Sequence, residues 1–314
     1  HTMLCAEVRE NKLFVFLPPV QSVEEFISLL ALIEEAAEAL GLPPKLIRVE
    51  SNNTTRVANV SPTAASVTTD INGKFTLNYV PSGKDIPVVI SVGKWRRVVT
   101  VPAVTDCTTT TLLAEQTRLP RKSSEGDIPL IAVVTGAADP IECVLPKLGI
   151  DASEYSLPTG SGRVRFYVAN GANFDTGAPS QSVLFGDPAE LAKYDAVIAD
   201  CEGGHFDKSA QWQQNLLDYL NKGGRFFASH FSYTWLYHNG PFAGTATWVP
   251  NTASLAGGTG LIDTSFPTGS AFATWLKNVG ASTTLGQIPV AQLRNDASHV
   301  NNPPAQRWIY LNDD

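Results

Sequence analysis

Strand-like apolar runs alternate with helix-like amphipathic runs through the second half of the chain, and this alternation restricts the possible folds more than any other feature. The sequence predicts strands at 127–136, 162–169, 194–201 and 225–229, and helices at 139–149, 187–194 and 207–224. Strands that alternate with helices form a mainly parallel sheet with helices on both faces. We therefore expect an α/β fold with a doubly wound, mainly parallel sheet over residues 126 to 290.

The helix signals in this region are specific. Trp212 and Leu216 lie on one apolar stripe at helical spacing, and Gly223 ends the pattern. A shorter helix is expected just before the third strand, where Asp187 can cap the first turn and Pro188 suits the first helical position. These local signals agree with the α/β fold.

Residues 1–50 are predicted to form a small strand-helix-strand segment. The run "KLFVFL" predicts a strand, and a helix is expected to begin at Ser22, where Glu25 completes a capping box, and to end at Gly41. We treat this α/β segment as a separate first domain.

Residues 51–118 are predicted to form a small β-sandwich. Alternating Thr, Val and Ser residues are interrupted by turn signals, among them Asn72-Gly73, whose residues tolerate a positive φ. Cys107 follows this segment, and Cys143 lies in the next predicted helix, so we expect a disulfide that joins them in an oxidising compartment. The third domain is expected to cover 126–314 and to continue beyond the chain.

Charge and composition narrow the classes of partner. The net charge of −7 disfavours nucleic acid as the main partner, because such proteins carry basic patches. No apolar run approaches the length of a membrane span. The many Gly, Pro, Thr, Ser and Asn residues favour an extracellular, cell-surface or periplasmic location. We expect no cofactor and no metal, and a carbohydrate or a peptide as the ligand.

Two polar segments follow consecutive predicted strands. "ADCEGGHFD" begins at Ala199, and "ASHFSYTWLYH" begins at Ala228. The carboxyl ends of parallel strands meet at one edge of a sheet, where ligands of such folds bind. We therefore expect one crevice there, with His230 and Ser229 as catalytic candidates. The expected ligand-binding residues are Cys201, Glu202, Gly203, Gly204, His205, Tyr233 and Trp235.

The text "YDAVIADCEGG…LLDYLNKGGRFFASHFSYTWL" resembles the class I glutamine amidotransferase-like fold, in its trehalose-utilisation-like (ThuA-like) branch. The resemblance covers about 126–290 and implies a flavodoxin-like sheet. In amidotransferases, the nucleophilic cysteine lies in a Gly-x-Cys-x-Gly turn after the strand that corresponds to 225–229. Here that turn has His230, as in the ThuA-like branch, and lacks both the cysteine and its glycines. A glutaminase is therefore disfavoured.

Three further resemblances concern the sandwich segment, its connection to the α/β domain and the first 48 residues. "TDINGKFTLNYVPSG" resembles carboxypeptidase regulatory-like, transthyretin-like sandwiches, and "GKWRR", "EGDIP" and "IDTSFP" resemble myxobacterial proteins that join such a sandwich to an α/β domain. This likeness implies a surface location. Residues 1–48 resemble a fragment of bacterial transglutaminase-associated proteins with an amidoligase-like region.

Three functions remain open. The first is a cell-surface or periplasmic binding or structural protein whose amidotransferase-like domain lacks the nucleophile. In this case Cys201 is inert, because the acids beside it would raise its pKa. The second is a hydrolase of a carbohydrate or an amide, with His230 as general base and the Gly203-Gly204 amides stabilising negative charge. The third is a metal-binding protein that uses His205 and His230. For Tyr233 and Trp235, a ligand groove and a core role both remain open.

Overall fold

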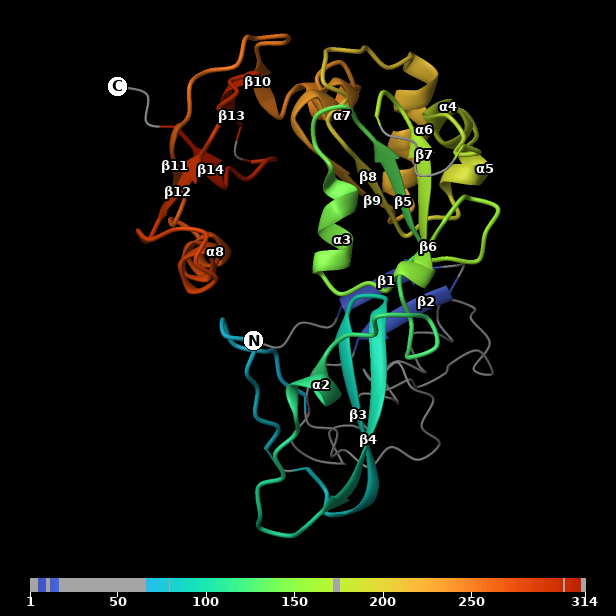
Figure 1. Ribbon diagram of the computed structural model, residues 1–314, viewed down its shortest axis with the longest axis vertical. Coiled ribbons are helices and arrows are strands. Elements are labelled where there is room, and N and C mark those ends of the chain that lie inside the picture. The colour runs from blue at the N-terminus through green and yellow to red at the C-terminus, as the bar shows by residue number, and fades with distance from the viewer. Residues whose placement is uncertain are drawn as a thin grey trace, which may run out of the picture. The chain divides into compact units, whose positions relative to one another are not determined.

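The computed structural model describes residues 5–9, 12–16, 66–78, 80–171, 176–301 and 303–311 (Figure 1). The chain divides into two compact units, His1–Ala65 and Ser66–Asp314. In the first, β1 (Cys5–Arg9) and β2 (Lys12–Phe16) pair antiparallel, and β2 confirms the strand predicted from "KLFVFL". The predicted helix between Ser22 and Gly41 lies outside the described residues.

A five-stranded parallel sheet forms the centre of the second unit and confirms the predicted α/β fold. Its order is β6-β7-β5-β8-β9, and every neighbouring pair is parallel. The sheet reverses its direction of growth at β5, because β7 is added on one side of β5 and β8 on the other. The strands are β6 (Tyr155–Ser156), β7 (Val164–Val168), β5 (Ile131–Thr135), β8 (Ala196–Ala199) and β9 (Arg225–Ala228).

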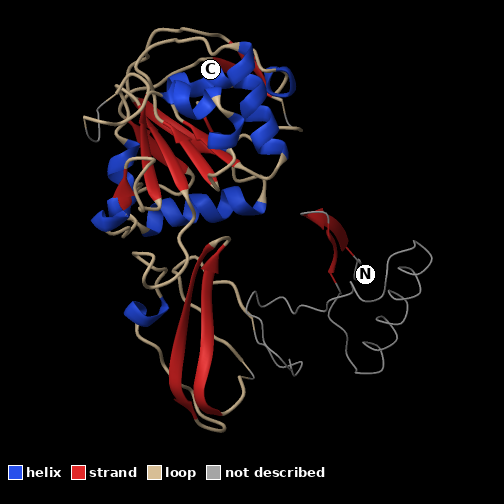
Figure 2. Cartoon of the chain, turned by 90° about the vertical axis from the view of Figure 1, so that its right-hand side faces the viewer, coloured by secondary structure: helices blue, strands red, loops and turns tan. Residues whose placement is uncertain are grey.

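Both faces of the sheet are covered, as expected for a doubly wound fold (Figure 2). All five residues of β5 are buried, and their side chains alternate between two apolar clusters. Ala132 and Val134 pack in the cluster that contains Leu216, whereas Ile131 and Val133 pack in the cluster that contains Leu145. This alternation explains why the strand reads as a continuous apolar run.

The helices match the sequence signals with shorter bounds. The caps are formed as predicted at Asp187, whose side chain accepts from Ala189 N, and additionally at Ser209, which accepts from Trp212 N. The helix expected over 139–149 is reduced to two short elements, since Pro146 lacks the N–H that a longer helix needs. The elements are η2 (Ile141–Cys143), α3 (Val144–Lys147), η3 (Ala152–Glu154), α4 (Gln181–Gly186), α5 (Pro188–Leu191), α6 (Ala210–Asn221), η4 (His230–Trp235) and α7 (Gly240–Ala243).

A long antiparallel hairpin precedes the sheet. β3 (Gly83–Val92) and β4 (Trp95–Val104) pair along their length around Gly93, which has a φ of 57°. The expected Asn72-Gly73 turn is present, and Gly73 has a φ of 73°. The strands that the sandwich prediction requires on either side of this turn are absent from residues 66–70 and 74–78. The complete sandwich remains a prediction, because residues 51–65 lie outside the described residues.

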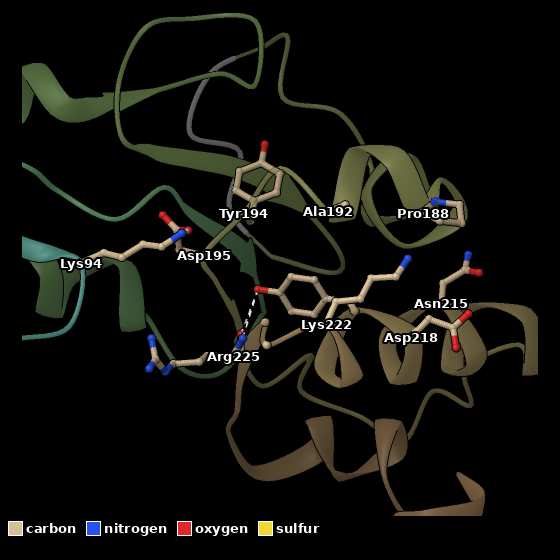
Figure 3. Close-up of a pocket in the computed structure, with 12 residues that line it drawn as sticks. Lys94, Pro188, Ala192, Tyr194, Asp195, Asn215, Asp218, Lys222 and Arg225 are labelled. Atoms are coloured by element: carbon tan, nitrogen blue, oxygen red, sulfur yellow. Dashed lines mark hydrogen bonds and ion pairs between the residues drawn. The ribbon is translucent and has the colours of Figure 1, made fainter. Parts of the chain in front are cut away.

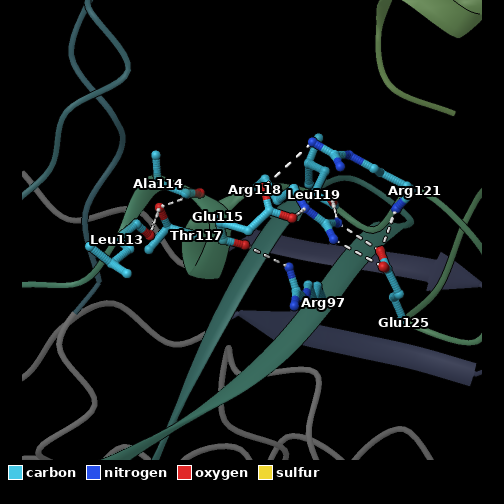
Figure 4. Close-up of polar contacts among 9 residues, drawn as sticks. All are labelled: Arg97, Leu113, Ala114, Glu115, Thr117, Arg118, Leu119, Arg121 and Glu125. Carbon is cyan, nitrogen blue, oxygen red and sulfur yellow. Dashed lines mark hydrogen bonds and ion pairs between the residues drawn. The ribbon is translucent and has the colours of Figure 1, made fainter.

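An ion-pair network follows the hairpin (Figure 4). It lies beside α2 (Ala114–Thr117), where Arg118 donates two parallel hydrogen bonds to the Glu125 carboxylate, at 2.7 and 2.9 Å. Arg118 also contacts Glu115, whose backbone carbonyl accepts from Arg97 of β4. The Arg118 guanidinium lowers the pKa of Glu125 to about 2. This network ties the hairpin to the segment that leads into β5.

Residues 246–310 differ from the expectation of a parallel sheet through residue 290, because they form two small antiparallel sheets. β10 (Ala246–Trp248) pairs with β13 (Ala297–Val300), and β11 (Gly258–Ile262) pairs with both β12 (Gln287–Val290) and β14 (Ile309–Tyr310). Helix α8 (Pro267–Asn278) connects β11 to β12. No helix in the described part of the chain is both long and apolar enough to span a membrane.

Candidate functional site

The segments that follow β8 and β9 lie side by side at the carboxyl edge of the sheet. Ser229 N donates to Ala199 O at 3.2 Å, and the Ser232 hydroxyl donates to Asp200 O at 2.8 Å. The parallel pairing of β8 with β9 brings both strand ends to this edge. The structure thus gathers the residues that the sequence placed after two separate strands.

Cys201, His230 and Asp296 form a continuous chain of side-chain contacts. Cys201 Sγ lies 3.2 Å from His230 Nδ1, and His230 Nε2 lies 3.0 Å from Asp296 Oδ2. A carboxylate only accepts hydrogen bonds, so Nε2 carries the proton and Nδ1 is free to accept from the thiol. The other oxygen of Asp296 accepts from both the backbone N and the hydroxyl of Thr252, each at 3.1 Å. This chain has the order of nucleophile, base and orienting acid.

Burial controls the protonation of both reactive groups. The Cys201 side chain is 1% exposed, and this burial raises the pKa of its thiol. The backbone N–H groups of Gly203 and Phe231 interact with the sulfur and act in the opposite direction. Burial also lowers the pKa of His230, against the opposing effect of Asp296. A neutral imidazole beside a neutral thiol is therefore the resting state near pH 7.

Asp200 and Glu202, the acids beside Cys201, are not the main cause of its raised pKa, contrary to the sequence analysis. The pKa of Asp200 is raised to about 8, first by burial and then by the Glu142 carboxyl, so Asp200 is mostly neutral near pH 7. Glu202 forms a buried ion pair with Lys208. The direction predicted for the Cys201 pKa is correct, but its main cause is burial, with Asp139 as the acid that contributes.

His205 belongs to a different set of hydrogen bonds from His230. Its Nδ1 lies 2.7 Å from the Tyr233 hydroxyl, and its Nε2 lies 3.0 Å from the Tyr237 hydroxyl. Tyr237 also donates to Asp207. Nowhere in the described ranges do three or more His, Cys, Asp or Glu side chains gather in a position to hold a metal ion.

The two candidate aromatic residues have different environments. Trp235 is completely buried and packs against Phe185 at a ring-centroid distance of 3.9 Å, so it is a core side chain rather than a ligand-binding one. Tyr233 joins Cys201 and Phe231 in a small buried cluster next to the candidate site. For Trp235 the assignment to a ligand site is therefore corrected.

The glycines and the serine of the predicted site lie at the same edge. Gly203 has a φ of 78°, which favours glycine, and it packs against Ala137 of the loop after β5. Gly204 lies against the ring of Phe206. The Ser229 hydroxyl is buried and has no hydrogen-bond partner among the described residues.

A crevice of about 480 Å³ opens beside these residues, between the segments that follow β5 and β7. The N–H of Ala138, in its wall, donates to Cys201 O at 3.1 Å, so the crevice adjoins the candidate triad. It is lined by Gly136, Ala137, Ala138, Pro140, Glu142, Asn170 and Gly171.

A second cavity, of about 250 Å³, lies at the opposite edge of the sheet (Figure 3). Its lining residues come from the turn of the hairpin, from the segments that precede β8 and β9, and from α6. Lys94 and Asp195 form an ion pair there, and Tyr219 bonds the backbone of Arg225. Because ligands of open α/β sheets bind at the carboxyl ends of strands, the crevice is the better candidate.

Sequence reasoning missed three residues of this site. Asp296 follows no strand of the parallel sheet and had no local signal. Glu142 fell within a predicted helix, and Asn170, which follows β7, donates to Glu202 O at 2.9 Å. The position of Asn170 after a predicted strand was the one usable signal.

The predicted bridge between Cys107 and Cys143 is not formed. Both thiols are free and exposed. Cys107 has a φ of 56° in the turn after β4, and Cys143 ends η2. The described residues therefore contain no disulfide bond between the hairpin region and the α/β region.

Comparison with known proteins gives partial matches. Residues 1–77 match a family described as "Putative amidoligase enzyme", which supports the resemblance of the first residues to amidoligase-like proteins. A 47-residue stretch is 51% identical to "Xanthine dehydrogenase" of Drosophila subobscura, and it covers 15% of this chain and 4% of that protein. The match thus spans a small part of that relative's length. No solved structure gives a significant match.

Proposed function

We propose that the protein is a hydrolase of amide or ester bonds that uses Cys201 as nucleophile and His230 as general base. The observation that carries this proposal is the continuous contact from Cys201 through His230 to Asp296. A nucleophile bonded to a base, and a base oriented by a third group, is the arrangement that acyl transfer needs. The sequence analysis named His230 as the general base of a hydrolase, and this proposal adds Cys201 as the nucleophile and Asp296 as the orienting acid.

The reaction proceeds in two steps. Cys201 transfers its proton to His230 Nδ1 while its sulfur attacks the acyl carbon, and the leaving group departs with a proton from the imidazolium. Water, deprotonated by His230, then attacks the thioester and releases the acid and the thiol. The backbone N–H groups of Gly203 and Phe231 interact with the sulfur and stabilise the thiolate as its proton moves to His230.

The hydrolysis of p-nitrophenyl acetate by the full chain tests this proposal. We expect Cys201→Ala and His230→Ala to remove turnover, and Cys107→Ala, which changes an exposed free cysteine, to retain it. Full turnover in both site variants would overturn the proposal.

A binding role without catalysis is the second candidate, and the burial of Cys201 favours it. A substrate can reach this thiol only if the covering side chains move. The same assay separates the two candidates, because a binding protein would show no turnover that depends on Cys201.

We also propose a family for the α/β region and a cellular location for the protein. The order β7-β5-β8-β9 corresponds to the strand order 2-1-3-4 of flavodoxin-like sheets, which supports the amidotransferase-like, ThuA-like resemblance of residues 126–314. The resemblance of residues 51–118 to carboxypeptidase regulatory-like sandwiches supports a cell-surface or periplasmic location. Residues 1–50 form the separate amidoligase-like segment, and the ligand is a carbohydrate or a peptide.

A further inference from the structure

The segment that follows β10 holds the acid of the proposed triad. The antiparallel pairing of β10 with β13 is extended by a backbone hydrogen bond from Val249 N to Asp296 O at 2.7 Å. Further along the same segment, the backbone N and the hydroxyl of Thr252 both donate to Asp296 Oδ1 at 3.1 Å. These bonds fix Oδ1, and Oδ2 accepts from His230 Nε2.

Tyr233, in η4, holds the same segment one residue earlier. Asn251 N donates to the Tyr233 hydroxyl at 2.7 Å. Asn251 has a φ of 62°, in the left-handed region that Asn adopts more readily than most residues. The Tyr233 side chain is buried, and its ring stacks on Trp248 at a centroid distance of 6.1 Å. Its hydroxyl therefore fixes the backbone at the turn from which Thr252 reaches Asp296.

The hydrogen bonds on the other side of Tyr233 have a defined direction. A carboxylate only accepts, so the Tyr237 hydroxyl donates its one proton to Asp207. The Tyr237 oxygen therefore accepts from His205 Nε2 at 3.0 Å, which leaves Nδ1 to accept from the Tyr233 hydroxyl at 2.7 Å. The Tyr233 oxygen is then the acceptor for Asn251 N. The hydrogen bonds around His205 and those around the triad are thus connected through Tyr233.

We propose that Tyr233 is a positioning residue of the triad, which acts on His230 through Thr252 and Asp296. This inference rests on the proposed function, because it concerns the orientation of the general base. Without the Tyr233 hydroxyl, the turn that contains Asn251 loses its support, and Asp296 is held less firmly. The proton of His230 is then no longer fixed on Nε2, because the hydrogen bond made by one ring nitrogen sets the tautomer.

A double-mutant cycle on the hydrolysis of p-nitrophenyl acetate by the full chain tests the proposal. Tyr233→Phe keeps the ring and should lower kcat by about 3- to 10-fold with little change in KM, the usual effect of one lost hydrogen bond. In an Asp296→Asn background the same change should have no further effect, because Tyr233 acts only through that acid. Equal losses in the two backgrounds would overturn the proposal. The matched control is Tyr155→Phe, in β6, which loses a hydrogen bond to Ile150 O and should leave kcat unchanged.

Two variants of Thr252 test the link between Tyr233 and Asp296. Thr252→Val removes the hydroxyl that bonds Asp296 and should reproduce the loss seen in Tyr233→Phe. Thr252→Ser keeps the hydroxyl and should recover most of that loss. Thermal melts establish that each variant is folded, and Thr252→Val keeps the test valid if Tyr233→Phe is not. Full kcat in both Tyr233→Phe and Thr252→Val would contradict the proposed role.

A measurement on His230 itself separates this role from the proposed hydrolysis. With isotope-labelled histidine, the NMR shifts of the ring nitrogens report which nitrogen carries the proton, and His230→Gln identifies the signals. We expect the Nε2–H tautomer in the wild type and a mixture of tautomers in Tyr233→Phe and Thr252→Val. An unchanged tautomer in both variants would overturn the positioning role even where turnover depends on Cys201. A changed tautomer in a protein without turnover would support the positioning role and overturn the hydrolysis alone.

Discussion

The polar groups at the two edges of the parallel sheet differ in whether they have hydrogen-bond partners. At the amino edge, Asp195 accepts from Leu130 N at 2.8 Å and pairs with Lys94, and Tyr219 bonds the backbone of Arg225. At the carboxyl edge, several buried side-chain atoms have no partner. In the described part of the chain, the residues with such atoms are Glu142, Gln181, Asp200, Ser229 and Trp235.

All five of these residues lie in segments that follow a strand of the sheet. Native proteins satisfy most buried polar groups, and each exception has its own cause, such as local strain, a catalytic role or a bound water or ion. The amino edge therefore holds the sheet to the hairpin, whereas among the described residues the carboxyl edge contains buried polar groups without partners, of which only that of Trp235 belongs to a core side chain. The comparison supports placing the triad of Cys201, His230 and Asp296 at the carboxyl edge.

The largest expected effect is on catalysis. His230→Ala should reduce the hydrolysis of p-nitrophenyl acetate by about 10²–10⁴-fold, the usual contribution of a general base. Tyr219→Phe, at the amino edge, loses its hydrogen bonds to Arg225 and should leave the rate unchanged. Steady-state kinetics measures both. Equal losses in the two variants would show that the edges do not differ in function.

The second prediction concerns Glu202, a buried group at the carboxyl edge that does have an ion-pair partner. Lys208→Met leaves Glu202 buried without its ion-pair partner and should lower the free energy of unfolding by about 3–5 kcal/mol. Urea denaturation measures the loss, and Lys193→Met, at an exposed ion pair with Glu190, is the control with little change. A loss below that of the control would contradict this assignment.

The third effect is a pH dependence. Burial and Glu142 raise the pKa of Asp200 from 3.8 to about 8, so the folded state holds a proton that the unfolded state releases. Stability should therefore fall as the pH rises between these values, by about 1.4 kcal/mol per pH unit from this group. In Asp200→Asn this contribution is absent. Urea denaturation at about pH 5, 6 and 7 measures the free energy of unfolding of both proteins. If this free energy changes equally with pH in the wild type and in Asp200→Asn, the assignment is wrong.

The smallest effect is expected at the amino edge. Asp195→Asn removes the ion pair with exposed Lys94 but keeps an oxygen that can accept from Leu130 N. The free energy of unfolding should fall by about 1 kcal/mol or less. A loss as large as that of Lys208→Met would show that the amino edge depends on charge as strongly as the carboxyl edge.

The sequence predicted the parts of the fold that local patterns determine. The buried run at Ile131 and the Asp187 cap follow from hydrophobicity and from capping, and both are present. The helix expected over 139–149 was too long, because Pro146 outweighs its apolar spacing. The antiparallel strands after residue 246 depend on contacts between distant segments, which local patterns do not contain.

The candidate site could be located from the sequence only in part. His230 and Cys201 follow neighbouring strands, so the fold brings them together. Asp296 lies 66 residues beyond His230 and reaches it through the segment before β13. Glu142 was hidden in a predicted helix, and burial, which sets its effect on Asp200, cannot be read from a single sequence.

Trapping of the acyl-enzyme tests the central claim most directly. The full chain is mixed with p-nitrophenyl acetate, quenched in acid, and analysed by peptide mass spectrometry. We predict an acetyl thioester on Cys201 in the wild type and its absence in His230→Ala. An acetyl group found only on exposed residues such as Cys107 or Cys143, or an equal amount on Cys201 in both proteins, would contradict the claim that Cys201, His230 and Asp296 act together.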